Sequence, residues 1–148
     1  MDDGLHNPSS NRQRKVLTVR WLIRLEELAL FGLSIWAFST TGFAWYWYPL
    51  LLLTPDLSML GYLAGPGTGA IFYNIVHHRA LALAIFLAGV VLSSPALQLT
   101  GTILFGHSSL DRVFGYGLKH PDSFQHTHLG WIGQQQTQSP APNQEPGG

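Results

Sequence analysis

Apolar residues form long runs, separated by short polar or Gly- and Pro-rich breaks, over most of this chain. The runs fall at about residues 21–39, 43–63, 69–92 and 96–114, and they lack the strict alternation of a half-buried strand. Each run is long enough for a helix that crosses ~30 Å of hydrocarbon, which takes ~20 residues. The pattern predicts an all-α fold, an integral membrane helical bundle of about four transmembrane helices.

The breaks between the runs predict where helices end. Residues 40–42 (Thr-Thr-Gly) end the first run, and residues 65–69 (Gly-Pro-Gly-Thr-Gly) predict a tight turn after the second. Pro49 and Pro55 are expected to bend or break the second helix, because proline lacks a backbone N–H. At residues 77–79 (His-His-Arg) two alternatives stay open: a continuous third helix, or two short pieces.

Charged residues are scarce in the middle of the chain. They make up 11% of the 148 residues, against about 25% in a typical soluble domain. Between Leu28 and Leu110 the only Asp, Glu, Lys or Arg residues are Asp56 and Arg79. Exposed apolar patches on soluble proteins rarely exceed a few hundred Å², so this region is expected in lipid. The net charge of zero argues against nucleic acid, and the absence of cysteine excludes thiol chemistry.

The basic residues predict the orientation in the membrane. The polar segment 1–20 is expected on the cytoplasmic side, because basic residues concentrate there. Four spans would return the C-terminus to the same side. The predicted domain covers residues 21–133 and ends in a His-rich juxtamembrane segment, and the polar tail 134–148 is expected to be disordered. The basic residues in question are Arg12, Arg14, Lys15 and Arg20 before the first run, and Arg112 and Lys119 after the last.

Polar side chains recur at a similar depth in all four predicted helices. Ionisable groups inside a membrane normally face the protein interior and have a partner, so these residues are expected to converge. Carboxylates and imidazoles from facing helices are the ligands with which helical bundles hold divalent metals. Without thiolates, the set suits Zn, Mn or Fe. The predicted ligands are Asp56, Asn74, His77, His107 and Asp111, with Glu26 as general base for a metal-activated water.

Spacing supports this hypothesis in part. His107 and Asp111 have the i,i+4 spacing that places two ligands on one helix face. Rotating the third helix by one residue would replace His77 with His78, and spacing does not decide between them. A hydrolase acting at the inner leaflet is the leading functional hypothesis.

Three other readings of the same residues remain open. The acidic and histidine residues can pair with Arg24, Arg79 and Arg112 and fix the bundle without chemistry. They can relay protons in a small transporter. They can also specify packing in a homo-oligomer or a larger membrane complex. Membrane lipids are the expected partners in each case.

Two further segments carry weaker signals. His126 and His128 are expected in the headgroup layer, with a folded-back metal-binding loop as the alternative. The glycines of residues 65–69 lack the Lys-Ser/Thr of a phosphate-binding P-loop and do not follow a strand, which argues against nucleotide binding.

Several strings in the chain resemble a family of short bacterial membrane proteins catalogued as domain of unknown function 4260. They lie at residues 55–62, 73–77, 107–119 and 127–130, and the Asp-Arg-x-x-Gly-Tyr-Gly-Leu-Lys string that starts at Asp111 is the most specific. The resemblance covers about residues 19–133. It implies a multi-pass protein of the bacterial inner (cytoplasmic) membrane, with both termini cytoplasmic and with no activity that it transfers.

A fainter similarity is to membrane-bound metal-dependent hydrolases. These combine a Pro-Asp near a helix end with a later His-Arg pair, as Pro55-Asp56 and His78-Arg79 do here. This chain has Ser58 where a second Asp is expected, and no Thr-His-Ser follows its His-Arg pair. The similarity favours hydrolysis over transport.

Overall fold

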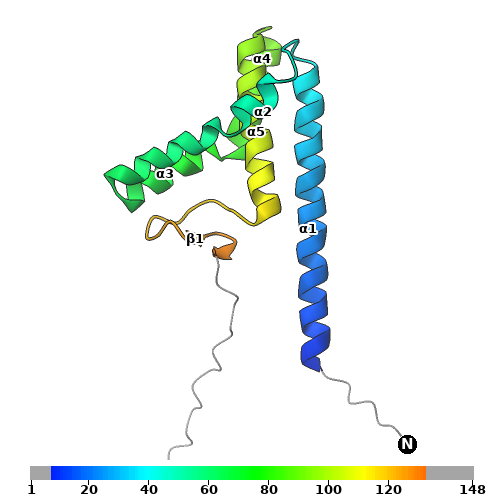
Figure 1. The fold of residues 1–148 in the computed structure, drawn as a ribbon, viewed down its shortest axis with the longest axis vertical. Helices are drawn as coiled ribbons and strands as arrows, with labels where there is room; N and C mark the ends of the chain where they lie inside the picture. The colour runs from blue at the N-terminus through cyan, green and yellow to red at the C-terminus, as the bar shows by residue number, and fades with distance from the viewer. Residues whose placement is uncertain (1–7, 133–148) are drawn as a thin grey trace, which may run out of the picture.

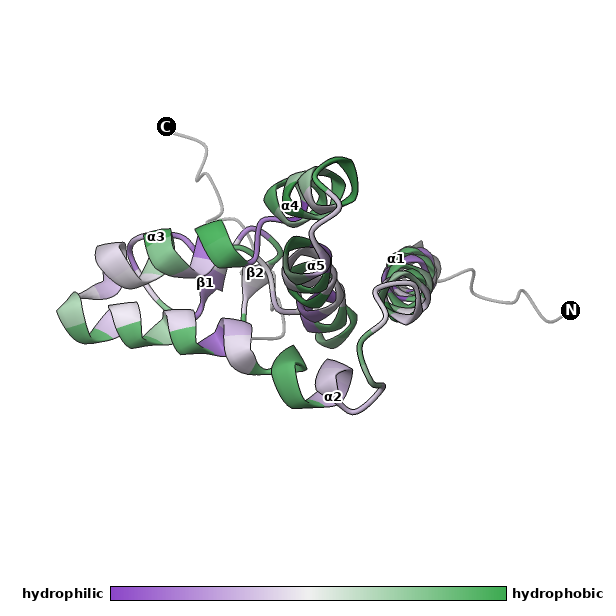
Figure 2. Cartoon of the chain, turned by 90° about the horizontal axis from the view of Figure 1, so that it is seen from above, coloured by the Kyte–Doolittle hydropathy of each residue, from purple (hydrophilic) through white to green (hydrophobic). Residues whose placement is uncertain are grey.

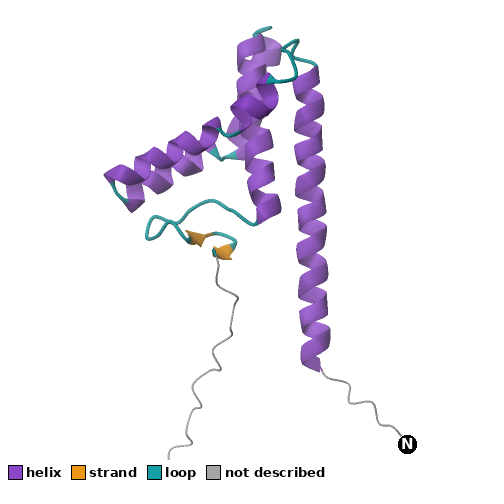
Figure 3. Cartoon of the chain, viewed as in Figure 1, coloured by secondary structure: helices purple, strands orange, loops and turns teal. Residues whose placement is uncertain are grey.

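The structure, a computed structural model, describes residues 8–132. It is mostly helical, as the all-α prediction requires, with one small β-hairpin near its C-terminal end (Figures 1 and 3). The predicted disordered tail at 134–148 and the first seven residues of the predicted cytoplasmic segment lie outside the described residues.

Three helices run side by side along the long axis (Figure 1). They are α1 (Pro8–Ser39), α4 (Arg79–Val91) and α5 (Pro95–Phe114), and α5 lies between the other two (Figure 2). The bounds of α5 agree with the predicted fourth segment. Helix α1 ends at Ser39 as predicted, but it begins at Pro8 and so includes much of the polar segment that was expected to precede the first span.

The second predicted segment, 43–63, is not one helix. It consists of α2 (Trp47–Leu52) and a 3₁₀ helix, η1 (Thr54–Ala64), with Pro55 at the start of η1. Proline cannot donate the backbone hydrogen bond that would continue α2, which explains the break there. The interruption of the third segment at residues 77–79 is also present: α3 (Pro66–Val76) and α4 are separate helices with a 42° bend between them.

Helices η1 and α3 form an antiparallel pair that projects sideways from α4 and α5 (Figure 1). Gly65, with φ +118°, makes the turn between them. A Cβ at Gly69 would collide with the ring of Tyr62, so the two helices approach closely because this position has no side chain. Through the η1–α3 pair, polar residues from outside the three long helices reach α5.

Small residues on α5 allow equally close packing along the long axis. A Cβ at Gly101 would meet the backbone of Phe86 on α4, and one at Gly106 would meet the hydroxyls of Tyr48 and Ser34. The Ser34 and Tyr48 hydroxyls are hydrogen-bonded to each other and link α1 to α2 beside α5. Such small residues at helix contacts are typical of bundles that pack by backbone proximity.

Large apolar side chains are exposed along α1 and α4, and α4 is coloured as largely hydrophobic in Figure 2, whereas on α5 the exposed large apolar side chain is Phe114, its last residue. Within residues 8–132, no individual helix is both long and apolar enough to cross a membrane, whereas α3 and α4 taken together meet the length and composition that a span needs.

The C-terminal segment folds back below the η1–α3 pair (Figure 1). Gly115, with φ +91°, ends α5 in the left-handed conformation that glycine favours. The hairpin pairs β1 (His126–Thr127) with β2 (Gly130–Trp131) in antiparallel register, and Lys119 forms a further bridge to Thr127. The chain thus returns toward the junction of α3 and α5.

Candidate metal site

Four potential metal ligands meet where the η1–α3 pair joins α5. Asp56 lies in the first turn of η1, His77 follows the last residue of α3, and His107 and Asp111 lie on α5. One ligand atom from each side chain lies within 4.8 Å of all the others. The structure therefore brings together four of the residues predicted from the sequence, from three separate elements.

The end of α3 decides which histidine faces inward. His77 is 3% exposed, whereas the His78 side chain is exposed and its Nδ1 accepts a hydrogen bond from the N–H of Leu81, capping α4. The helix break at this point turns the two consecutive side chains in different directions. His77 is thus the inward residue, and the His78-Arg79 pair that resembled the hydrolase motif supplies no ligand to the group.

The distances between the ligand atoms suit one small ion. The Nε2 of His107 lies 3.3 Å from Asp56 Oδ1 and 3.7 Å from Asp111 Oδ1. The Nε2 of His77 lies 3.5 Å from Asp111 Oδ2 and 3.8 Å from Asp56 Oδ1. In a tetrahedral site with ligands at about 2.0–2.1 Å from the ion, neighbouring ligand atoms are about 3.3–3.4 Å apart. The observed separations are close to that value.

Both histidines have their tautomer fixed by the backbone. His77 Nδ1 lies 2.8 Å from the carbonyl oxygen of Tyr73, and His107 Nδ1 lies 2.7 Å from that of Leu52. A carbonyl oxygen only accepts, so each Nδ1 must carry the hydrogen and donate. In the neutral rings each Nε2 then presents a lone pair, and the two Nε2 atoms lie 3.0 Å apart. Two lone pairs at that distance repel unless a cation or a proton lies between them.

Tyr73 orients two members of the group. Its ring stacks on His77 with centroids 3.7 Å apart, and its hydroxyl donates to Asp111 Oδ2 at 2.8 Å. Stacking contacts and hydrogen bonds to the ligands of a metal ion fix the orientation of those ligands. No role was predicted for Tyr73 from the sequence, although Tyr73 stands four residues before His77 and the two residues therefore share one helix face.

Asn74 is not a member of the group of four. Its Nδ2 donates to the carbonyl oxygen of Lys119 at 2.8 Å, and its Oδ1 accepts from the Lys119 N–H at 2.7 Å. Both ends of the amide are thus used to fasten the C-terminal segment to α3. Asn74 was predicted as a ligand, whereas its amide lies outside the group of four and bonds the backbone of Lys119.

Glu26, the predicted general base, has an exposed side chain on α1 and does not join the group. The adjacent Glu27 is the buried carboxylate, and it accepts a hydrogen bond of 2.6 Å from Arg79. Glu27, Ser34 and Phe38 are buried on α1 at spacings of seven and four, which is the helix face that packs inward. The sequence does not distinguish this face from that of Glu26, because Leu33 and Ala37 stand at the same spacings from Glu26.

The histidines of the C-terminal hairpin also lie outside the group. His126 bonds Asp122 at 2.8 Å and stacks on Trp131, and His128 Nδ1 accepts from the N–H of Leu118. The hydrogen bond from His126 lowers the pKa of the Asp122 carboxyl. These contacts stabilise the hairpin itself.

Three of the four strings that carried the family resemblance build the site: residues 55–62 contribute Asp56, residues 73–77 contribute Tyr73 and His77, and residues 107–119 contribute His107 and Asp111. A family model matches residues 20–132. The chain belongs to the family described as Domain of unknown function (DUF4260). No curated protein and no solved structure gives a match to this DUF4260 chain. The matched region contains all four ligands, so the candidate site belongs to the part of the chain that the family model describes.

Proposed function

We propose that this DUF4260 protein binds a divalent metal ion between Asp56, His77, His107 and Asp111, inside a membrane-embedded domain, and uses the ion for hydrolysis. The observation that carries the proposal is the pair of Nε2 atoms 3.0 Å apart in two rings whose Nδ1 atoms are both committed to backbone carbonyls. This arrangement presents two lone pairs to one point.

Charge favours a metal ion at that point. With both histidines neutral, the group carries two negative charges from Asp56 and Asp111, which a divalent cation neutralises. Within residues 8–132, no arginine lies within 4.0 Å of the Asp56 or Asp111 carboxylate. Arg79 is paired with Glu27 instead. The purely structural alternative, in which arginines balance these carboxylates, is therefore not favoured. Two nitrogen and two oxygen ligands without thiolate suit Zn, Mn or Fe.

Hydrolysis needs the site to admit water and a substrate. The Asp56 side chain is 39% exposed, whereas Asp111 is 19% and both histidines are 3% exposed. The site is thus closed on the side of α5 and open on the side of η1. His77, His107 and Asp111 would hold the ion from the closed side, and Asp56 is the ligand on the exposed side, from which water and a substrate would reach the ion.

The membrane location is part of the same proposal. It is supported by the scarcity of charge between Leu28 and Leu110, by the exposed apolar side chains of the long helices, and by the apolar length of α3 and α4 together. The start of α1 and the end of α5 lie at the same end of the molecule (Figure 1), and basic residues gather there. By the positive-inside rule that end is cytoplasmic, in the bacterial inner membrane, with the site toward the inner leaflet.

Elemental analysis of untagged, detergent-purified protein tests the proposal. We expect about one equivalent of Zn, Mn or Fe per chain, lost in His107→Ala and in Asp111→Ala. His120→Ala and Asp122→Asn are matched controls, because these residues are exposed and lie outside the group. Metal-free wild-type protein would overturn the metal site and favour a proton held between the histidines, whose signature is pH-dependent ion flux in proteoliposomes.

A further inference from the structure

Lys119 is a buried cation close to the candidate metal site. It is 4% exposed, although it follows α5 in a loop. Its Nζ lies 4.0 Å from the ring centroid of Phe124, 5.2 Å from that of Tyr73 and 5.8 Å from that of Tyr116. Three aromatic rings therefore surround the ammonium.

The rings do not satisfy the ammonium. An ammonium has three N–H donors, and aromatic faces attract its charge but offer no lone pair of a carboxylate or carbonyl oxygen. In the part of the chain that the structure describes, the Lys119 side chain makes no hydrogen bond and has no carboxylate within 4.0 Å. The Nζ atom itself keeps some accessible surface, so an anion from outside the chain can reach it and supply the missing acceptor.

The main chain holds this side chain in place. The backbone N–H and carbonyl of Lys119 both bond to the amide of Asn74 on α3, and Lys119 bridges to Thr127 of β1. The ammonium is thus built into the junction of α3 and the hairpin, which distinguishes it from a surface lysine.

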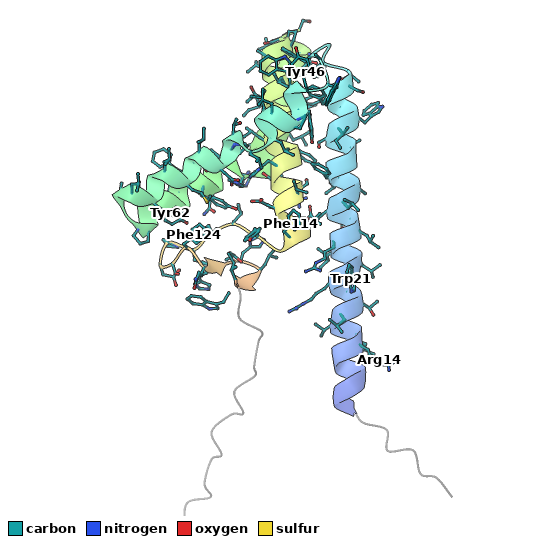
Figure 4. All side chains as sticks on the ribbon, in the orientation of Figure 1. Arg14, Trp21, Tyr46, Tyr62, Phe114 and Phe124 are labelled. Atoms are coloured by element: carbon teal, nitrogen blue, oxygen red, sulfur yellow. The ribbon has the colours of Figure 1, made fainter. Side chains whose placement is uncertain are left out.

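A second unpartnered donor belongs to the same aromatic cluster. The Tyr62 hydroxyl is buried and has no hydrogen-bond partner within residues 8–132. The rings of Tyr62 and Phe124 meet edge to face, with centroids 5.3 Å apart at 82°. Figure 4 shows Tyr62 on η1 facing Phe124 of the C-terminal loop, the same ring over which the Lys119 ammonium lies. Phe124 therefore contacts both the Lys119 ammonium and the ring of Tyr62.

Tyr73 connects these donors to the candidate metal site. The Lys119 ammonium lies over the Tyr73 ring, which stacks on His77 and whose hydroxyl bonds Asp111. A single side chain thus separates the ammonium from two of the proposed ligands.

We infer that Lys119 and Tyr62 form an anion subsite beside the metal site and that it takes the phosphate group of a phosphorylated substrate. The role as a substrate subsite rests on the function proposed above. Phosphate fits best because its several oxygens can accept from an ammonium and a hydroxyl while another oxygen faces the ion. The same group occurs in a phospholipid headgroup and as a free phosphate ester.

Binding measurements on full-length, metal-analysed protein test this inference. Inorganic phosphate is titrated by calorimetry into detergent-purified protein, and mixed detergent micelles that contain phosphatidylcholine with or without phosphatidic acid are titrated into the same protein in parallel. We expect Lys119→Met to weaken phosphate binding about tenfold or more and Tyr62→Phe to weaken it less, because a charged hydrogen bond contributes more than a neutral one. The matched controls are Lys15→Met, the other lysine of the chain, and Tyr46→Phe, both with exposed side chains.

The possible results separate the two proposals. Metal content that is equal in wild type and Lys119→Met, with phosphate binding lost only in the variant, supports the subsite. Binding that depends on Lys119 with phosphatidic acid but not with inorganic phosphate assigns the subsite to a lipid headgroup. Equal binding in wild type, Lys119→Met and Tyr62→Phe overturns the inference, as does the absence of binding to either probe by metal-loaded wild type. Absence of metal with Lys119-dependent phosphate binding overturns the proposed function and leaves the anion subsite standing.

Discussion

The imidazole rings of His77 and His107 meet edge to face at a centroid distance of 4.9 Å, with their Nε2 atoms 3.0 Å apart. The two residues come from different helices, and each ring is held from behind by a backbone carbonyl. Their meeting depends on the break after α3, since a continuous helix would carry His77 past α5 in a different direction. The interruption of the third apolar segment is therefore what creates the candidate metal site.

Removing the metal is expected to destabilise the protein. A ligand that binds only the folded state stabilises it by RT ln(1 + [L]/Kd), and a divalent ion here would also neutralise two neighbouring carboxylates. We expect dialysis against a chelator to lower the thermal unfolding midpoint, and addition of Zn, Mn or Fe to restore it. His107→Ala should unfold at the same temperature with and without chelator. Identical midpoints for treated and untreated wild type would contradict the prediction.

Two adjacent glutamates on α1 should differ sharply on substitution. Glu27→Ala leaves the partly buried guanidinium of Arg79 without its carboxylate, and removing one member of a buried pair costs roughly 3–5 kcal/mol. Because the Arg79 side chain is 25% exposed, we expect the free energy of unfolding to fall by about 3 kcal/mol, the lower end of that range. Glu26→Ala, at an exposed position, should change stability by less than about 0.5 kcal/mol. Chemical denaturation of both variants in detergent measures the difference, and equal losses would show that the pair contributes nothing specific.

Two helix glycines should respond to alanine with opposite signs. A Cβ at Gly106 would meet the Tyr48 and Ser34 hydroxyls, and overpacking of this kind typically costs about 1–3 kcal/mol. Gly32 on α1 has nothing within 4 Å of an added Cβ, so alanine there should stabilise by about 0.5–1 kcal/mol through helix propensity. Thermal unfolding of Gly106→Ala and Gly32→Ala tests this. A stabilising Gly106→Ala would show that α1 and α2 pack less closely on α5 than described.

The charge of Lys119 should make stability depend on pH. Burial lowers the pKa of the Lys119 ammonium below its ordinary value of 10.5. Between the lowered pKa and 10.5 the unfolded chain binds more protons than the folded chain, so stability rises with pH in that window and is constant below it. In phosphate-free buffer we therefore expect Lys119→Met to be more stable than wild type at pH 7, with the difference shrinking as pH approaches 10.5.

Unfolding curves of the two proteins at several pH values measure this difference, with Lys15→Met as the control that should follow wild type. A variant that is less stable than wild type at neutral pH would mean that the aromatic rings around Lys119 compensate its burial fully.

The sequence by itself predicted the helical class, the C-terminal end of α1, the bounds of α5, a bend or break at Pro55, and a group of polar residues that includes the four side chains of the site, and it left the continuity of the helix at residues 77–79 open. These features depend on local chemistry: proline cannot donate a backbone hydrogen bond to a preceding helical turn, and scarce ionisable residues in apolar runs must face one another.

Only the tertiary structure decided which neighbour of each pair faces inward. His77 rather than His78, and Glu27 rather than Glu26, are selected by the direction in which α3 ends and by the face of α1 that packs on α5. The burial of Lys119 is decided by the loop that folds back onto Asn74. A shift of one residue on a helix turns a side chain by about 100°, and only the contacts between distant segments fix that rotation.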